Sequence, residues 1–188
     1  MENTIIYLIG FAGVGKFTIA QQLHLKTGAQ IVDNHLINNP ILSVIYTDGI
    51  TPIPKAAWHK IAIIRQTVYS AIEDISPKNW NFIFTNELID GYKVDAEIFA
   101  SIAHIAQKRN SIFIPVRLIC DLDELSRRVQ STDRASRYKL TSVEATHHKF
   151  ESFSVLKCDH PNTLTLDVTH LTATESADKI IEHIKAIR

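Results

Sequence analysis

The sequence predicts an α/β fold in which helices cover both faces of a parallel sheet. Short apolar, β-branched runs alternate with longer segments of helical period along the 188 residues. These runs are almost continuously apolar, which is typical of strands buried on both faces. A chain of this length favours one domain with a substantial core, so we expect a single unit over residues 1–188.

Five runs rich in β-branched and aromatic residues are expected to be the strands. In chain order they are Thr4–Ile9, Gln30–Val32, Asn81–Thr85, Ser111–Cys120 and Thr163–Leu166. Segments of helical period separate them, and this alternation indicates parallel pairing. Pro115 is unusual inside such a run, because proline cannot donate a hydrogen bond to the sheet.

The segments between the strands show the helical period. The expected helices are Lys16–Lys26, most of His35–Ile75, Val94–Lys108, Asp121–Gln130, Ser142–Ser152 and Thr174–Ile187. Gly28 ends the first of them as a left-handed cap. A glycine and two prolines within 48–54 mark a loop inside the longest segment. That segment is long for a plain crossover, so we expect residues 34–76 to form a helical substrate-binding region.

The turn after the first strand has the spacing of a phosphate-binding loop, G-x-x-x-x-G-K. Its glycines let the backbone approach phosphate oxygens, and the helix that follows adds partial positive charge at its N-terminus. Lys16 would place a compact charge against the β- and γ-phosphates. The residues predicted to hold the phosphates are Gly10, Gly13, Val14, Gly15, Lys16, Phe17 and Thr18.

Phe17 departs from this motif, which normally has a Ser or Thr hydroxyl there to hold Mg²⁺. Thr18 does not simply replace it, because one helical step rotates a side chain by about 100°. Three outcomes stay open: Mg²⁺ held by other groups and water, weak metal dependence, or binding without efficient transfer. The metal ligands are therefore left unassigned.

A dinucleotide-binding loop is an alternative interpretation. Gly10, Gly13 and Gly15, with Asp33 about 20 residues further on, approximate that fingerprint. Lys16 counts against it, because a dinucleotide loop needs no positive charge there. A hydride-transfer enzyme also has no obvious need for the arginine-rich segment described below.

Asp33 and Glu87 each follow an expected strand, at the edge of the sheet where open α/β folds bind ligands. Asp33 is a candidate catalytic and substrate-binding acid, which would accept a proton from a substrate hydroxyl or bind Mg²⁺ through water. It is equally suited to cap the next helix. Glu87, beside Asn86, could orient a metal-bound water or a substrate hydroxyl, or belong to a polar turn.

Two further side chains have weaker support. Arg65 is a candidate anion clamp for a substrate, with a solvated helix face as its alternative. His35, next to Asp33, lacks an evident partner that would orient it as a base.

Residues 127–139 carry five cations in thirteen positions. We expect 131–141 to be a lid loop whose Arg134 and Arg137 stabilise charge on a transferring phosphoryl group. Arg127 or Arg128 would contribute from the preceding helix, since only one of two adjacent residues can face the site. The alternative is a solubilising surface loop.

Composition excludes several other classes. Twenty basic residues balance twenty acidic ones, so the net charge supports neither a nucleic-acid surface nor a polybasic membrane surface. Cys120 and Cys158 make no disulfide framework or metal pair. The first apolar run is too short for a signal peptide or a membrane span. We expect a cytoplasmic monomer or homodimer whose partners are a nucleotide and a small molecule.

In these features the chain resembles the small P-loop kinases of the nucleoside monophosphate kinase-like group, such as shikimate kinase, gluconate kinase and chloramphenicol phosphotransferase. The resemblance implies a three-layer P-loop NTPase fold with strand order 2-3-1-4-5, ATP as donor and Mg²⁺ as cofactor. It also implies that Arg127 or Arg128, with Arg134 and Arg137, would be lid cations. Asp33 would be the acceptor-side acid, with Asp167–Thr169 near the adenine.

The resulting hypothesis is a kinase that transfers the γ-phosphoryl group of ATP to a hydroxyl of a small metabolite. Shikimate itself is not expected, because the third strand lacks the glycine run that follows it in shikimate kinases. Phe17 motivates the alternative of a nucleotide-binding switch or sensor with little or no transferase activity.

Overall fold

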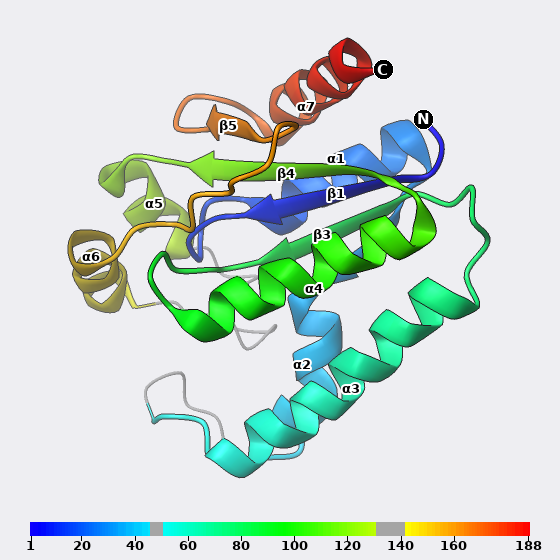
Figure 1. Ribbon diagram of the computed structural model, residues 1–188. Helices are drawn as coiled ribbons and strands as arrows, with labels where there is room; N and C mark the ends of the chain where they lie inside the picture. The colour runs from blue at the N-terminus through cyan, green and yellow to red at the C-terminus, as the bar shows by residue number, and fades with distance from the viewer. Residues whose placement is uncertain (46–50, 131–141) are drawn as a thin grey trace.

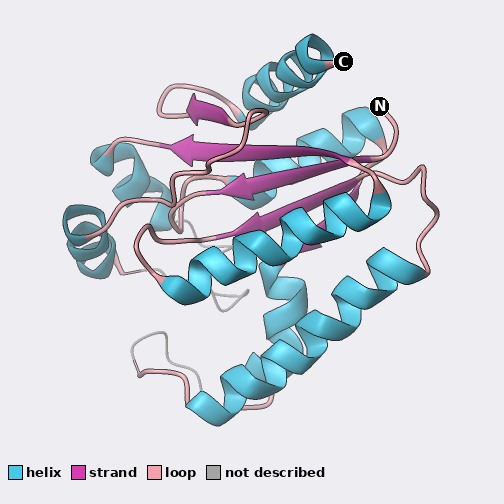
Figure 2. Cartoon of the chain, viewed as in Figure 1, coloured by secondary structure: helices cyan, strands magenta, loops and turns pink. Residues whose placement is uncertain are grey.

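The computed structural model describes residues 1–45, 51–130 and 142–188 (Figure 1). Within these ranges five parallel strands form one sheet in the order β2-β3-β1-β4-β5, as expected. The strands are β1 (Thr4–Ile9), β2 (Gln30–Asp33), β3 (Phe82–Asn86), β4 (Ile112–Ile119) and β5 (Leu164–Asp167). The arrows of β1, β3, β4 and β5 point the same way in Figure 2, and β2 pairs in parallel with β3, so the carboxyl ends of the strands share one edge.

The described helices agree with the expected ones to within a residue or two at most ends. They are α1 (Lys16–Thr27), α2 (Asn34–Leu42), α3 (Lys55–Asp74), α4 (Lys93–Arg109), α5 (Leu122–Val129), α6 (Val143–Ser152) and α7 (Ala173–Ile187). The helical region expected over 34–76 contains α2 and α3. None of the described helices is both long and apolar enough to cross a membrane.

The central strand β1 divides the core into two halves. Ile5, Tyr7 and Ile9 face the layer that contains α2, α3 and α4, whereas Ile6 and Leu8 face α1 and α7. All five are fully buried, and burying one such apolar side chain stabilises a fold by about 1.5–3 kcal/mol. In Figure 1, α4 crosses the near face of the sheet and α1 lies behind it. This three-layer packing explains the nearly unbroken apolar character of the strands.

The far end of α3 is fixed to the sheet by one buried arginine. The Arg109 guanidinium donates hydrogen bonds to the carbonyl oxygens of Ile72, Ser76 and Pro77. It also lies 5.0 Å from the ring centroid of Phe82, and its burial lowers its pKa. Ile72 is in the last turn of α3, whose final carbonyl groups lack partners within the helix, and Ser76 and Pro77 follow it. The cation therefore satisfies one of these carbonyl groups, complements the helix dipole and holds the segment that follows α3.

Candidate functional site

The loop between β1 and α1 is shaped by glycines whose replacement would strain or crowd the backbone. Gly13 and Gly15 have φ values of 95° and 101°, in the left-handed region that glycine adopts without strain. A Cβ atom on Gly10 would lie 2.8 Å from the Leu118 carbonyl oxygen. A Cβ atom on Gly13 would lie 2.6 Å from Val129. The backbone is therefore packed too closely for side chains at these positions.

Lys16 begins α1 and reaches back over this loop. Its Nζ donates to the carbonyl oxygens of Gly10 at 2.7 Å and Phe11 at 2.9 Å. Gly15 precedes the helix and provides no side-chain cap. A helix N-terminus of this kind favours an anion, because its backbone dipoles converge there. The loop thus has the form expected of a phosphate-binding cradle.

A cavity of about 820 Å³ runs along the carboxyl edge of the sheet. Residues 12–19 form its centre, because β1 is the central strand. Residues after β2 and the start of α3 line one end, and residues 168–173 after β5 line the other. Gly13, Val14, Gly15, Lys16, Phe17 and Thr18 all belong to the wall, together with Asp33, Glu87 and Arg128. The fold thus brings most of the predicted site residues to one cavity.

Asp33 lies at the end of β2 and is only 5% exposed. Its Oδ1 accepts a 2.5 Å hydrogen bond from the Thr85 hydroxyl, and its Oδ2 accepts the backbone N–H of His35 at 3.2 Å. The capping role considered for Asp33 is confirmed, since it is the N-cap of α2. The same two contacts fix the carboxylate in the cavity wall, where an acceptor hydroxyl could meet it. Its acid–base role stays a prediction.

Asn86, at the end of β3, organises buried polar groups behind the loop. Its Oδ1 accepts the Tyr7 hydroxyl at 3.0 Å, and its Nδ2 donates to Asn34 at 3.0 Å. Its carbonyl oxygen accepts the Gly10 N–H at 3.3 Å. Burial raises the pKa of Tyr7 well above its ordinary value, so this phenol remains a donor. The network holds the start of the phosphate-binding loop against β3.

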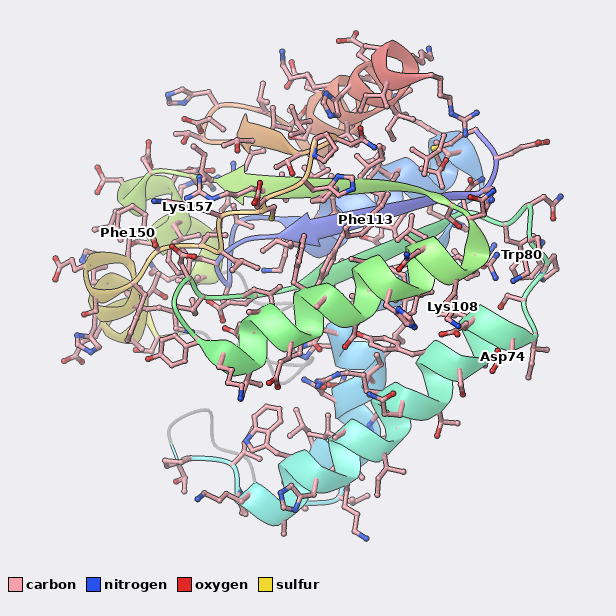
Figure 3. The ribbon with its side chains drawn as sticks, in the orientation of Figure 1. Asp74, Trp80, Lys108, Phe113, Phe150 and Lys157 are labelled. Atoms are coloured by element: carbon pink, nitrogen blue, oxygen red, sulfur yellow. The ribbon has the colours of Figure 1, made fainter. Side chains whose placement is uncertain are left out.

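Glu87 contacts the loop directly. Its Oε1 accepts the backbone N–H of Ala12 at 3.1 Å, and its Oε2 pairs with Lys149 Nζ at 3.0 Å. Lys149 lies on α6, whose Phe150 ring is 5.9 Å from the ring of Phe11. Figure 3 shows Phe150 at the end of the molecule opposite Asp74 and Trp80. Glu87 therefore connects α6 to the loop, a role that sequence reasoning missed together with Lys149.

Arg127 and Arg128 both line the cavity, so the expectation that only one of them faces the site is wrong. Glu124, from the same helix, also belongs to the cavity wall. The Arg128 guanidinium donates to the carbonyl oxygens of Val14 at 3.1 Å and Val168 at 2.8 Å. It joins the phosphate-binding loop to the segment after β5, which was expected near the adenine.

Glu124 holds both of these arginines. Its carboxylate oxygens lie 2.6 Å from the Nε atoms of Arg127 and Arg128. The two hydrogen bonds from Arg127, followed by the one from Arg128, lower the pKa of Glu124 to about 2. The carboxylate is thus charged at neutral pH and fixes the direction of the guanidinium that braces the loop.

Three predicted residues do not join this group in the described structure. Arg134 and Arg137 lie outside the described residues. Arg65 is absent from the cavity wall: it occupies the stripe of α3 that faces the core and lies near the hydroxyl groups of Tyr7 and Tyr69. The geometry thus offers no support for Arg65 as an anion clamp, and its surroundings are also not those of a solvated helix face.

No family model matches this sequence, and a search of curated proteins also finds no match. Among solved structures, a candidate kinase from Chloroflexus aurantiacus j-10-fl superposes with a TM-score of 0.66 at 14% identity, covering 99% of this chain and 98% of that one. A gluconokinase from Sinorhizobium meliloti 1021 gives 0.61 at 13% identity, covering 98% and 93%. A shikimate kinase from Acinetobacter baumannii in complex with shikimate gives 0.55 at 15% identity, covering 98% and 94%.

These similarities define a class by fold. The strand order, the loop after the central strand and the full-length superpositions show that this chain has the fold of the small P-loop kinases. Identities of this size establish shared architecture, and they leave the reaction to be argued from the cavity.

The phosphate-binding loop lacks the side chain that normally holds Mg²⁺ in this fold class. Phe17 follows Lys16 where this fold class normally presents a hydroxyl. The carboxylate oxygens of Asp33 and Glu87 already accept hydrogen bonds from protein groups. In the described ranges no three His, Cys, Asp or Glu side chains gather to hold a metal.

Proposed function

We propose that the protein binds ATP and transfers its γ-phosphoryl group to a hydroxyl of a small molecule. The observation that carries this proposal is that the phosphate-binding loop and a buried acid lie in the wall of the same cavity. The phosphate-binding loop with Lys16 forms its centre, and the fixed, buried carboxylate of Asp33 lies in the wall toward α2. Phosphoryl transfer depends mainly on positioning and on charge stabilisation, and these residues can supply both.

In this proposal the loop N–H groups and Lys16 bind the triphosphate. Arg128 holds the loop in shape, and its direct contact with nucleotide remains a prediction. Asp33 orients the acceptor hydroxyl and takes its proton as the oxygen attacks the γ-phosphorus. The bond between that phosphorus and the ADP oxygen breaks, giving ADP and a phosphate monoester. We assign Arg134 and Arg137 to the transferring group as charge-stabilising cations from the 131–141 loop.

ATP binding is measured first, by thermal shift with and without Mg²⁺. The nucleotide should raise the Tm of the wild-type protein, as expected for a ligand that binds the folded state. Lys16→Ala should abolish the shift, whereas Lys108→Ala, an exposed lysine on α4, should keep it. If saturating ATP leaves the wild-type Tm unchanged, nucleotide binding is refuted.

ADP release in the presence of pooled sugars, nucleosides and acids then separates a kinase from a binder. The second candidate function is a nucleotide-binding switch or sensor, which Phe17 favours because its ring offers no oxygen to a metal. ATP binding without ADP release from any pool would support that candidate over the kinase.

A further inference from the structure

The acceptor end of the cavity differs in chemistry from the nucleotide end. Asp33, His35, Asn38, Leu42, Ile53 and Trp58 line it, from the end of β2 to the start of α3. Among the described lining residues, the lysine and arginine side chains are Lys16, Arg127 and Arg128. These come from the central loop and from α5, toward the β4 and β5 side of the sheet. The described acceptor end therefore contains no arginine or lysine for an anionic group of the acceptor.

Asn38 provides the most specific feature of this end. It is 4% exposed and lies in the cavity wall, and its Oδ1 has no hydrogen-bond partner in the described structure. A buried carbonyl oxygen without a donor costs free energy in the free protein. The oxygen itself is buried in the free protein, so a ligand hydroxyl would reach it once the Asn38 side chain turns toward the cavity. That hydrogen bond would remove the cost, and an acceptor without such a hydroxyl would leave it in place.

Trp58 gives the same end an apolar surface. The residue is 43% exposed, and it shares the cavity wall with Leu42 and Ile53. Aromatic side chains in such positions bind ligands that have one apolar face and polar edges. Trp58 beside Asn38 thus suits a compact ring whose hydroxyls point away from the indole.

We infer that the phosphoryl acceptor is an uncharged, multiply hydroxylated ring compound, of the sugar or nucleoside kind, and that Asn38 is the residue that selects it. This inference rests on the proposed kinase function and names its substrate class. One hydroxyl donates to Asn38 Oδ1, and a second loses its proton to Asp33 as its oxygen bonds to the γ-phosphorus and ADP leaves. A carboxylate or phosphate ester at this end would face Asp33 with no described lysine or arginine to balance it, only the His35 imidazole.

The first test measures stability and binding in two matched variants. Asn38→Leu removes the orphan oxygen from the cavity wall, and Asn79→Leu makes the same change at an exposed position outside it. We expect Asn38→Leu to keep or raise the Tm of the free protein, because it replaces an unsatisfied polar group. It should keep the ATP-induced shift while raising the acceptor KM at least about tenfold. A lower Tm of the free Asn38→Leu protein, with Asn79→Leu unchanged, would show a structural role and overturn the assignment of Asn38.

The second test uses wild-type protein and acceptor pairs in which one member carries an added carboxylate and both keep the same sugar hydroxyls, such as uridine with orotidine and phenyl glucoside with 4-carboxyphenyl glucoside. Binding is measured by calorimetry with a non-hydrolysable ATP analogue present, and turnover by ADP release. At least one neutral member should bind and be phosphorylated, with its anionic counterpart weaker by about tenfold or more. The inference is overturned if the protein prefers the anionic members, or if no neutral member of the panel binds. In either case the ATP-binding result is unaffected. Loss of the wild-type ATP shift would instead refute the proposed function itself.

Discussion

Asp33 combines a structural and a chemical position in one side chain. It caps α2 through the His35 N–H and is fixed by the Thr85 hydroxyl, while its carboxylate lies in the cavity wall. A charge held in this way needs little reorganisation when a substrate arrives. The two roles separate under one substitution, because asparagine caps helices about as well as aspartate but cannot take a proton.

Asp33→Asn should therefore keep the fold and lose the reaction. The amide oxygen can accept the His35 N–H, and the amide nitrogen can donate to Thr85, so the Tm should change little. Phosphoryl transfer should fall by about 10²–10⁴-fold, the usual contribution of a general base. Initial rates of ADP release and thermal unfolding measure the two effects. Asp121→Asn, the same change at the cap of α5, serves as control and should keep full activity. Equal rates for wild type and Asp33→Asn would exclude a role in proton transfer.

Phe17 is the residue at which this loop leaves the usual pattern. A phenyl ring beside Lys16 cannot coordinate a cation, and no described cluster of metal-binding side chains replaces it. We expect the Kd of wild-type protein for ATP to change by less than about threefold, or about 0.7 kcal/mol, between excess Mg²⁺ and EDTA.

Phe17→Ser should restore metal dependence, giving tighter ATP binding in Mg²⁺ than in EDTA. Phe17→Ala is the matched control, because it removes the ring without supplying an oxygen. Isothermal titration of ATP into each variant measures the ratio of the two dissociation constants. The prediction fails if the wild-type protein binds ATP only with Mg²⁺ and the Phe17→Ser protein has the same ratio of Kd values in EDTA and in Mg²⁺. That result would show that another group holds the metal.

The stability of the elements around the cavity depends on close backbone packing as well as on the burial of apolar side chains. The phosphate-binding loop lies between β1 and α5, and Gly13 is the point of closest approach, 2.6 Å from Val129 to an added Cβ. Gly28 ends α1 with a similar positive φ of 70°, but no atom lies within 4 Å of its added Cβ. The two glycines therefore share a positive φ, but only Gly13 is packed closely against a neighbouring element.

Gly28→Ala should cost about 1–2 kcal/mol of unfolding free energy, the strain of a side chain in the left-handed region. Gly13→Ala should cost about 2–5 kcal/mol, because overpacking against α5 adds to the same strain. Urea unfolding of the two variants gives the comparison. Indistinguishable losses would mean that α5 moves away from the loop at no cost.

At the level of the whole molecule, contacts across the sheet edge join segments that follow different strands. Arg128 connects the loop after β1 to the segment after β5, and Glu124 fixes Arg128. The Arg127 and Arg128 hydrogen bonds lower the pKa of Glu124 from 4.5 to about 2 in the folded protein. A lowered folded-state pKa contributes stability above the unfolded value, which is lost as pH falls through the folded value.

The wild-type protein should accordingly lose stability between pH 4.5 and pH 2 in part through Glu124. Glu124→Gln removes this titration, so its Tm should fall less steeply with pH over that interval. Glu182→Gln, at an exposed position on α7, should follow the wild-type slope. Thermal unfolding at several pH values gives Tm as a function of pH. If wild type and Glu124→Gln show parallel curves, the titration of Glu124 does not contribute to the loss of stability.

Much of the fold and part of the site could be predicted because their causes are local. The period of the apolar residues located all the described strands, and the glycine spacing located the loop. The position of Asp33 at the end of β2 followed from the strand boundary itself. Lys149, by contrast, lies 62 residues from Glu87 in the sequence, and no periodicity connects them. The surroundings of Arg65 were not predicted for a related reason, because its interactions with Tyr7 and Tyr69 depend on how α3 packs against the sheet.

The sequence by itself determined the parallel strands, the order of strands and helices along the chain, and a loop whose glycines and Lys16 form an anion-binding site. These features depend on neighbouring residues and on the simple rule that parallel strands end at one edge. The tertiary structure alone decided the brace made by Arg128, the link from Glu87 to Lys149 and the orphan oxygen of Asn38. Each of these depends on which distant groups packing brings within hydrogen-bond distance, or fails to bring, and that outcome is a property of the folded chain as a whole.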